Sequence, residues 1–283
     1  MLKVSHYLRV MITGIGVLPT IGWAAEQMVL TREDQRPVTV VKYIPQQHCQ
    51  GIAIISHGAG GSQYGYAYLA NFLQQQQWLV LVVDHQESNS EVLKQLLSRQ
   101  GIIESLSEMV TTATAYTARF MDISVAQTWG KQHCIGDRQL MIGHSMGAAT
   151  TMLLAGAENN LNVVAPKLSF DAYIALSPQG VGSIFPKDAW RHINKPILLL
   201  TGTKDRELHG SWQSRQDAFY SLPAGCKWLG VINGANHLNF AGKGASGKTE
   251  RLVTQTVAEF IEGVKQKQCQ PLLKLKGLSL RNK

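Results

Sequence analysis

The stretch Leu140-Met141-Ile142-Gly143-His144-Ser145-Met146-Gly147 decides the fold. It begins with an apolar run that is typical of a buried strand. The residues that follow it, 148–154, are small or apolar and predict a buried helix. The G-x-S-x-G pattern between them is typical of a sharp strand-to-helix turn that lifts a serine hydroxyl out of a sheet. The alternative is an ordinary glycine-rich turn. The flanking strand and helix favour Ser145 as a nucleophile.

Strand-like and helix-like runs alternate along the chain, which predicts a mostly parallel sheet flanked by helices. The expected strands are residues 38–44, 51–56, 78–84, 140–144, 172–177, 197–202 and 227–232. The expected helices are residues 66–76, 104–129, 146–157, 212–222 and 249–265, and residues 86–100 are expected to be a loop or a short helix. No linker divides the chain, so we expect one domain over residues 26–270.

A nucleophilic serine needs a base, and the base needs an acid that orients it. Asp205 and His237 each follow a predicted buried strand, in the chain order serine, acid, histidine. The carboxyl ends of parallel strands meet at one edge of a sheet, so we expect Ser145, Asp205 and His237 to converge. Glu207 is the alternative acid. His144 is expected to point away from the site and to have a packing or hydrogen-bonding role.

A glycine-rich stretch, His57-Gly58-Ala59-Gly60-Gly61-Ser62, follows the predicted strand 51–56. A tetrahedral intermediate needs two N–H donors aimed at its oxygen, and we assign them to the backbones of Ala59 and Met146. His57 is expected to brace this loop. Phosphate binding is excluded because the stretch has neither a Gly-Lys-Ser/Thr sequence nor G-x-G-x-x-G spacing.

These motifs, together with Val83-Asp84-His85, Leu176-Ser177-Pro178-Gln179-Gly180 and Thr201-Gly202-Thr203-Lys204-Asp205, resemble bacterial α/β-hydrolases similar to dienelactone hydrolase and platelet-activating-factor acetylhydrolase. The resemblance covers about residues 35–265. It implies an α/β-hydrolase fold and a serine hydrolase with the residues named above, without a metal or an organic cofactor. Dienelactone hydrolases proper use a cysteine nucleophile, whereas this chain has Ser145.

The expected activity is the hydrolysis of small-molecule carboxylic esters with short-to-medium acyl groups. An acyltransferase with the same acyl-enzyme and a non-catalytic ligand-binding protein remain alternatives, and a peptidase is neither selected nor excluded. Only residues 178–196 separate the strand 172–177 from the strand 197–202, so we expect a minimal lid with at most a short helix at 188–193. Tyr64, Tyr66 and Trp212 are candidate walls of an open substrate cleft, and at least one of them is expected to be core.

Residues 1–25 have the pattern of a secretory signal peptide: Lys3 and Arg9 precede an apolar run over residues 10–21, and small residues follow it. A buried first helix and a short membrane anchor are the alternatives. A cleaved signal peptide implies a periplasmic or secreted protein.

The formal net charge of +8 falls to +6 without residues 1–25, and it is concentrated at the C-terminus. Residues 265–283 contain no acid and six cations, Lys265, Lys267, Lys274, Lys276, Arg281 and Lys283. The rest is therefore close to neutral, which argues against nucleic-acid binding. We expect residues 271–283 to be a basic, loosely docked tail, with weak contact to an anionic membrane surface as the alternative.

Four cysteines in an exported chain suggest two disulfides. In the folds that the chain resembles, the strands 51–56 and 140–144 are parallel neighbours, which brings Cys49 and Cys134 to the same end of the sheet. The last helix returns to the start of the strand 227–232, which brings Cys269 to Cys226. The resemblance therefore implies the pairs Cys49–Cys134 and Cys226–Cys269, and four buried free thiols are the alternative.

Overall fold

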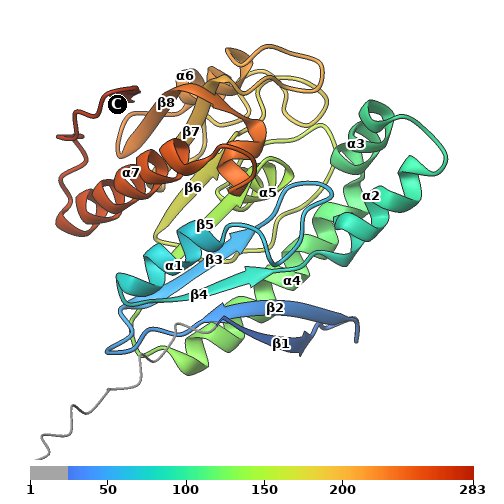
Figure 1. The fold of residues 1–283 in the computed structure, drawn as a ribbon, viewed down its shortest axis with the longest axis horizontal. Coiled ribbons are helices and arrows are strands. Elements are labelled where there is room, and N and C mark those ends of the chain that lie inside the picture. The colour runs from blue at the N-terminus through green and yellow to red at the C-terminus, as the bar shows by residue number, and fades with distance from the viewer. Residues whose placement is uncertain (1–24) are drawn as a thin grey trace, which may run out of the picture.

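The computed structural model describes residues 25–283, so nearly all of the predicted signal peptide lies outside the described residues. Within them nine strands form one sheet in the order β1-β2-β4-β3-β5-β6-β7-β8-β9 (Figure 1). The strands are β1 (Glu26–Thr31), β2 (Pro37–Tyr43), β3 (Gly51–Ser56), β4 (Trp78–Val83), β5 (Arg138–His144), β6 (Ala172–Leu176), β7 (Ile197–Lys204), β8 (Lys227–Asn236) and β9 (Leu278–Asn282).

The centre of the sheet is parallel and dry. Strands β4, β3, β5, β6, β7 and β8 run parallel to one another. Every residue of β3, β4 and β6 is buried, which is what a strand covered on both faces requires. The seven predicted strands all form, and the carboxyl ends of the central ones meet along one edge.

Helices cover both faces of this sheet (Figure 1). They are α1 (Ala67–Gln75), α2 (Ser90–Leu97), α3 (Ile102–Thr111), α4 (Ala113–His133), α5 (Met146–Leu154), α6 (Asp217–Ser221) and α7 (Gly247–Gln266), with the short 3-10 helices η1 (Gln86–Ser88), η2 (Ser214–Gln216) and η3 (His237–Ala241). Buried side chains of α1 and α7 form one core cluster with the sheet, and those of α4 and α5 form another. The two clusters place the chain in three layers.

The single helix expected over residues 104–129 is two helices in the structure. Thr112 is extended, with φ −78° and ψ 107°, and it separates α3 from α4. The hydroxyls of Thr111 and Thr112 donate to the carbonyls of Ser107 and Glu108, each four residues back. Two adjacent β-branched residues with such side-chain bonds favour a break in a helix.

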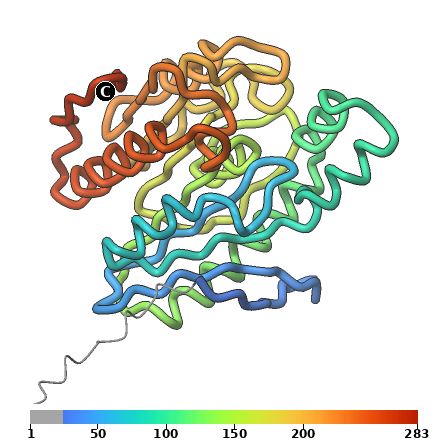
Figure 2. The backbone as a smooth tube through the Cα atoms, in the orientation of Figure 1, coloured from blue at the N-terminus to red at the C-terminus, as the bar shows by residue number. Residues whose placement is uncertain are grey.

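The ends of the sheet differ most from expectation. β1, which was not predicted, pairs antiparallel with β2. The expectation of a loosely docked tail over residues 271–283 was wrong for its last part, because residues 278–282 form β9 and pair antiparallel with β8 (Figures 1 and 2). The physical reason is that β8 would otherwise leave a row of backbone N–H and C=O groups unpaired at the sheet edge.

Two disulfides close the sheet at its N-terminal ends. Cys49 is bonded to Cys134, and Cys226 is bonded to Cys269, the same pairs that the resemblance implied. Two disulfides are typical of an oxidising compartment outside the cytosol. No helix within residues 25–283 has the length and apolar character needed to cross a bilayer.

Candidate active site

Ser145 lies in a strained turn between β5 and α5. Its φ of 55° and ψ of −119° are rare for a residue with a side chain, and such strain is kept where the surroundings impose it. A Cβ at Gly143 would lie 1.9 Å from the carbonyl oxygen of Gly147, and a Cβ at Gly147 would lie 2.1 Å from the carbonyl oxygen of Ser56. Only glycine fits at either position. The turn leaves Ser145 partly exposed while its neighbours are buried.

The predicted acid and base are in contact. Asp205, fully buried after β7, accepts a hydrogen bond at 2.9 Å from Nδ1 of His237, which begins η3. Its second oxygen accepts from the hydroxyl of Thr201 at 2.9 Å. Burial alone would raise the pKa of Asp205, but the bond from His237 and the charge of Arg215 hold this pKa below its usual value. Asp205 is therefore a carboxylate that fixes the tautomer of His237.

Glu207, the alternative acid, faces elsewhere. Its Oε1 accepts a hydrogen bond at 2.7 Å from the backbone N–H of Gly180, and it makes no hydrogen bond to His237 among the described residues. Burial raises its pKa. It supports the loop after β6.

Arg215, which the sequence did not reveal, is buried beneath the Asp205 loop. Its guanidinium donates to the carbonyls of Asp205, Ser177, Pro178 and Arg206 at 2.7–3.1 Å. Its Nε also lies 2.9 Å from Oδ1 of Asp205. One side chain therefore fastens the acid to the loop that follows the neighbouring strand β6.

A second buried link joins the glycine-rich loop to the base. The hydroxyl of Tyr66 accepts from the N–H of Gly58 at 3.2 Å and donates to Nδ1 of His144 at 2.9 Å. Nε2 of His144 then donates to the carbonyl of His237 at 3.1 Å. Burial, and next the charge of His237, lower the pKa of His144, which keeps it neutral in this role. His144 thus has the hydrogen-bonding role expected of it.

Ser145 lies next to the glycine-rich loop and directly follows His144 in the chain. The rings of His144 and His237 are 4.6 Å apart, and a Cβ at Gly58 would lie 3.0 Å from the Cβ of Ser145. Within residues 25–283 the Ser145 hydroxyl makes no hydrogen bond to His237. Such contacts commonly tighten only when substrate is bound, so this geometry is compatible with the predicted pair.

The glycine-rich loop leaves one N–H free beside Ser145. Those of Gly58, Gly60 and Gly61 donate to Tyr66, Ser88 and Gly58, whereas the N–H of Ala59 has no partner in the described part of the chain. The N–H of Met146, first residue of α5, is equally without a partner there. The two N–H groups nominated from sequence are thus both available to an anionic oxygen.

The candidate cleft residues have different positions. Tyr66 is buried and belongs to the hydrogen-bonded link described above, as expected for at least one of the three. Tyr64 is 65% exposed, and its hydroxyl bonds to Gln27 of β1. Trp212 is half-buried against the core. The structure does not gather the three around one space.

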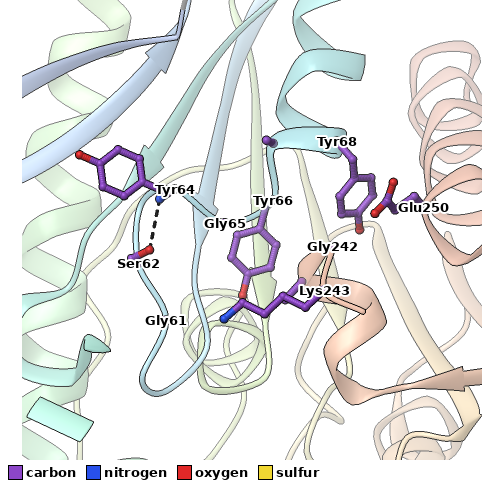
Figure 3. A pocket seen from close by; sticks show the side chains of 11 residues that line it. Gly61, Ser62, Tyr64, Gly65, Tyr66, Tyr68, Gly242, Lys243 and Glu250 are labelled. Carbon is purple, nitrogen blue, oxygen red and sulfur yellow. Dashed lines mark hydrogen bonds between the residues drawn. The ribbon is translucent and has the colours of Figure 1, made fainter. Parts of the chain in front are cut away.

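A cavity of about 320 Å³ lies between the start of α1 and the end of η3 (Figure 3). Tyr66, just before α1, and Tyr68 of α1 line it on one side, and Gly242 and Lys243 after η3 and Glu250 of α7 line it on the other. Tyr64 is also at its wall, but Figure 3 shows its ring turned away from those of Tyr66 and Tyr68. The cavity therefore borders the predicted base through η3.

Two segments flank the mouth of the site. Residues 178–196 form turns without the expected short helix, which leaves a minimal lid there. Helices α2 and α3 stand off the body beside the carboxyl edge of the sheet (Figure 1). Leu93 of α2 packs on Gly60, and Ser107 of α3 bonds at 2.9 Å to His209 in the loop after Asp205. This pair of helices therefore contacts both the glycine-rich loop and the acid loop.

The described residues contain no cluster of three or more His, Cys, Asp or Glu side chains arranged to hold a metal ion.

Similar structures have the same architecture. A protein of Klebsiella pneumoniae, provisionally described as a dienelactone hydrolase, is 17% identical with a TM-score of 0.59 over 84% of this chain and 98% of its own. Est1E from Butyrivibrio proteoclasticus is 16% identical with a TM-score of 0.58, over 86% and 100% of the two chains. The esterase domain of a Rhodothermus marinus protein is 13% identical with a TM-score of 0.57, over 86% and 99%.

The chain has the α/β-hydrolase fold. Residues 47–186 of this α/β-hydrolase match the family model described as serine aminopeptidase, S33. No curated protein sequence matches the chain. The matched segment carries the glycine-rich loop and Ser145, and it ends before Asp205 and His237. The match therefore covers the half of the predicted site that holds Ser145.

Proposed function

We propose that this α/β-hydrolase is a serine esterase that cleaves carboxylic esters with Ser145, His237 and Asp205. The observation that carries the proposal is the pair of unpartnered N–H groups of Met146, directly after a strained serine, and of Ala59, in the glycine-rich loop next to that serine. Free backbone donors at such a position stabilise the oxyanion of acyl transfer. The hydrogen bond between Asp205 and His237 supplies the oriented base.

The reaction is a two-step acyl transfer. His237 takes the proton of Ser145 as the oxygen attacks the ester carbonyl, and the oxyanion binds the N–H groups of Ala59 and Met146. The tetrahedral intermediate collapses, His237 gives its proton to the leaving alkoxide, and an alcohol departs. Water, activated by His237, then attacks the acyl-enzyme, and a carboxylic acid is released as Ser145 regains its proton.

The substrates that we propose are small esters with short-to-medium acyl chains, because only turns lie between β6 and β7 above the site. The two disulfides and the N-terminal sequence pattern favour a periplasmic or secreted location. An acyltransferase would share the acyl-enzyme, and added alcohol acceptors would then yield a new ester at the expense of the free acid.

One further candidate is a peptidase, which the description of the matched family as serine aminopeptidase favours. It uses the same nucleophile but a poorer leaving group. Aminoacyl p-nitroanilides tested beside p-nitrophenyl esters distinguish the two activities.

The test uses the purified protein, p-nitrophenyl acetate and a fluorophosphonate probe. We expect the wild type to be labelled and active, Ser145→Ala to be unlabelled, and the rate to fall by on the order of 10⁴-fold or more in Ser145→Ala and His237→Ala. Asp205→Ala is expected to lose somewhat less. Folded Ser145→Ala with wild-type turnover would exclude this serine as the nucleophile.

A further inference from the structure

A buried arginine lies under the glycine-rich loop. Arg119 of α4 is fully buried, and its Nη1 donates to the carbonyl of His57 at 2.7 Å and to the hydroxyl of Ser56 at 3.1 Å. Its Nε donates to the hydroxyl of Ser88 at 2.9 Å. No carboxylate among the described residues lies within 4.0 Å of this guanidinium, and burial lowers its pKa to about 10. A buried, unpaired cation is costly, which calls for a specific role.

The contacts of Arg119 fix the backbone on both sides of Ala59. On one side Arg119 binds the carbonyl of His57, whose Nε2 accepts from the N–H of His85 at 3.0 Å. On the other side the N–H of Gly60 donates to the carbonyl of Ser88 at 3.0 Å. The hydroxyl of this same Ser88 binds Arg119. The free N–H of Ala59 therefore has its direction set by bonds that share one guanidinium.

A buried Ser–His–Asp array supports the same guanidinium. Ser56 Oγ lies 2.8 Å from Nε2 of His85, and Nδ1 of His85 lies 2.8 Å from Oδ2 of Asp122. This resembles a catalytic triad, but all three residues are buried and the hydroxyl of Ser56 accepts from Arg119. Because Nδ1–H of His85 donates a hydrogen bond to Asp122, Nε2 of His85 accepts a hydrogen bond from the Ser56 hydroxyl. The lone pairs of the Ser56 oxygen are then free to accept from Arg119. The array orients the Ser56 hydroxyl toward Arg119, which binds the glycine-rich loop, and its burial keeps substrate out.

The acidic side chains around Arg119 are held by partners other than its guanidinium. Asp122 is 3.1 Å from Nη1 of Arg32, which also meets Glu87 at 3.0 Å. Asp122 and Glu87 are thus engaged by Arg32, whereas Asp84 lies 3.4 Å from Nε2 of His57 and accepts a hydrogen bond from Asn89. The carbonyl of His57, which Arg119 binds, belongs to the peptide unit next to the one that carries the N–H of Ala59. Positive charge fixed there favours negative charge on an oxygen bound to that N–H.

We propose that Arg119 is the positioning residue of the oxyanion hole, holding the N–H of Ala59 in place through His57 and Ser88 and adding an unpaired positive charge beneath it. The proposal rests on the proposed function. It predicts an effect on the transition state and not on substrate binding, because the guanidinium has no access to the cleft.

The experiment compares Arg119→Met, Arg119→Lys and the control Tyr116→Phe with the wild type. Tyr116 is buried on the same helix and donates to the carbonyl of Val110 at 2.9 Å, so its change removes a buried hydrogen bond away from the loop. We expect Arg119→Met to lower kcat for p-nitrophenyl acetate about 100-fold with KM changed less than about 3-fold. The kcat of Arg119→Lys is expected to be at least about 5-fold higher than that of Arg119→Met. The kcat of Tyr116→Phe is expected to stay within about 2-fold of the wild-type value.

A second readout separates positioning from a general loss of structure. A trifluoromethyl ketone forms a tetrahedral anion on the serine, so its Ki should rise in Arg119→Met by the same factor by which kcat/KM falls. Unchanged kcat, a Ki that does not follow kcat/KM, or equal losses in Tyr116→Phe would overturn the proposal. If Arg119→Met does not fold, the same comparison with Arg119→Lys decides, and a wild-type kcat in that variant overturns it.

The wild type and Ser145→Ala are measured first. If the wild type shows no hydrolysis that depends on Ser145, the proposed esterase function fails, independently of Arg119. If that dependence is found and the Arg119 variants behave like Tyr116→Phe, only the positioning role fails.

Discussion

Arg215 contacts Asp205 twice, through a hydrogen bond from Nε to the backbone carbonyl at 2.7 Å and through a 2.9 Å approach of the same nitrogen to the carboxylate. Both residues are buried, with at most 4% of either exposed. The pair therefore fixes the main chain and the side chain of the predicted acid together. It also gives the buried carboxylate a permanent counter-charge.

Removing the Arg215 side chain is expected to destabilise the protein strongly. Arg215→Met leaves Asp205 buried without its cation and four carbonyls without a donor, so the free energy of unfolding should fall by about 3–5 kcal/mol. Arg191→Met is the matched control, because Arg191 forms an exposed pair with Glu158 at 2.7 Å and should change stability by less than about 1 kcal/mol. Urea unfolding measures both, and equal effects would contradict the structural role of Arg215.

The stability of the protein is expected to depend on the ionisation of Asp205. Its pKa in the folded state is below the ordinary value of 3.8, so charged Asp205 contributes stability above the unfolded-state pKa. That contribution is lost as the pH falls through the folded-state pKa. The difference in Tm between the wild type and Asp205→Asn should therefore narrow between pH 7 and pH 3. Exposed Asp137→Asn serves as control, and a constant difference for Asp205→Asn would speak against the linkage.

The two disulfides are expected to stabilise the fold unequally. The Cys49–Cys134 bond spans 85 residues and the Cys226–Cys269 bond spans 43. On the loop-entropy argument, serine replacement of each pair should cost about 4–5 kcal/mol for the first and about 4 for the second. Denaturant unfolding of the two double variants measures the order. A clearly larger loss for the shorter loop would show that native-state contacts, and not chain entropy, dominate.

Short acyl esters are expected to react faster than long ones. With only turns over residues 178–196, added methylenes gain little burial beyond the first few carbons. We expect acetyl to hexanoyl p-nitrophenyl esters to exceed the palmitoyl ester in kcat/KM, without a rate increase above the critical micelle concentration. A preference for palmitoyl esters with interfacial activation would instead assign the acyl-binding surface to α2 and α3.

The central fold and the predicted site could be inferred from sequence because their signals are local. Strands covered on both faces are continuous apolar runs, as in residues 197–200 of β7, and the serine turn is defined by nearby glycines. β1 and β9 lacked that signal because edge strands are half-exposed and mixed with polar residues. The alternation of Leu278 and Leu280 with Ser279 and Arg281 was the one pattern that pointed to β9.

The arginines could not be inferred in the same way. Arg215 and Arg119 act on backbone carbonyls from distant segments, and a carbonyl acceptor has no sequence signature. Arg215 lies in a polar stretch that is typical of a solvated loop. Arg119 lies among Tyr116, Phe120 and Ile123, all buried, and this apolar surrounding on one helix was the signal that it faces inward.

Strand β9 sets the order in which the site can be completed. Ribosomes make the chain from its N-terminus, so the serine turn exists well before residues 278–282, whose pairing closes the edge of β8. β8 leads directly into His237, and Lys283 is bonded to Gly225 and Lys227 at the start of the same strand. A nascent chain therefore has the Ser145 turn early, but the strand that leads to the predicted base is paired on both sides only after residues 278–282 have been made. Ribosome stalling or truncation that removes β9 would release a protein in which the turn at Ser145 is present but β8, the strand that leads to His237, has one edge unpaired.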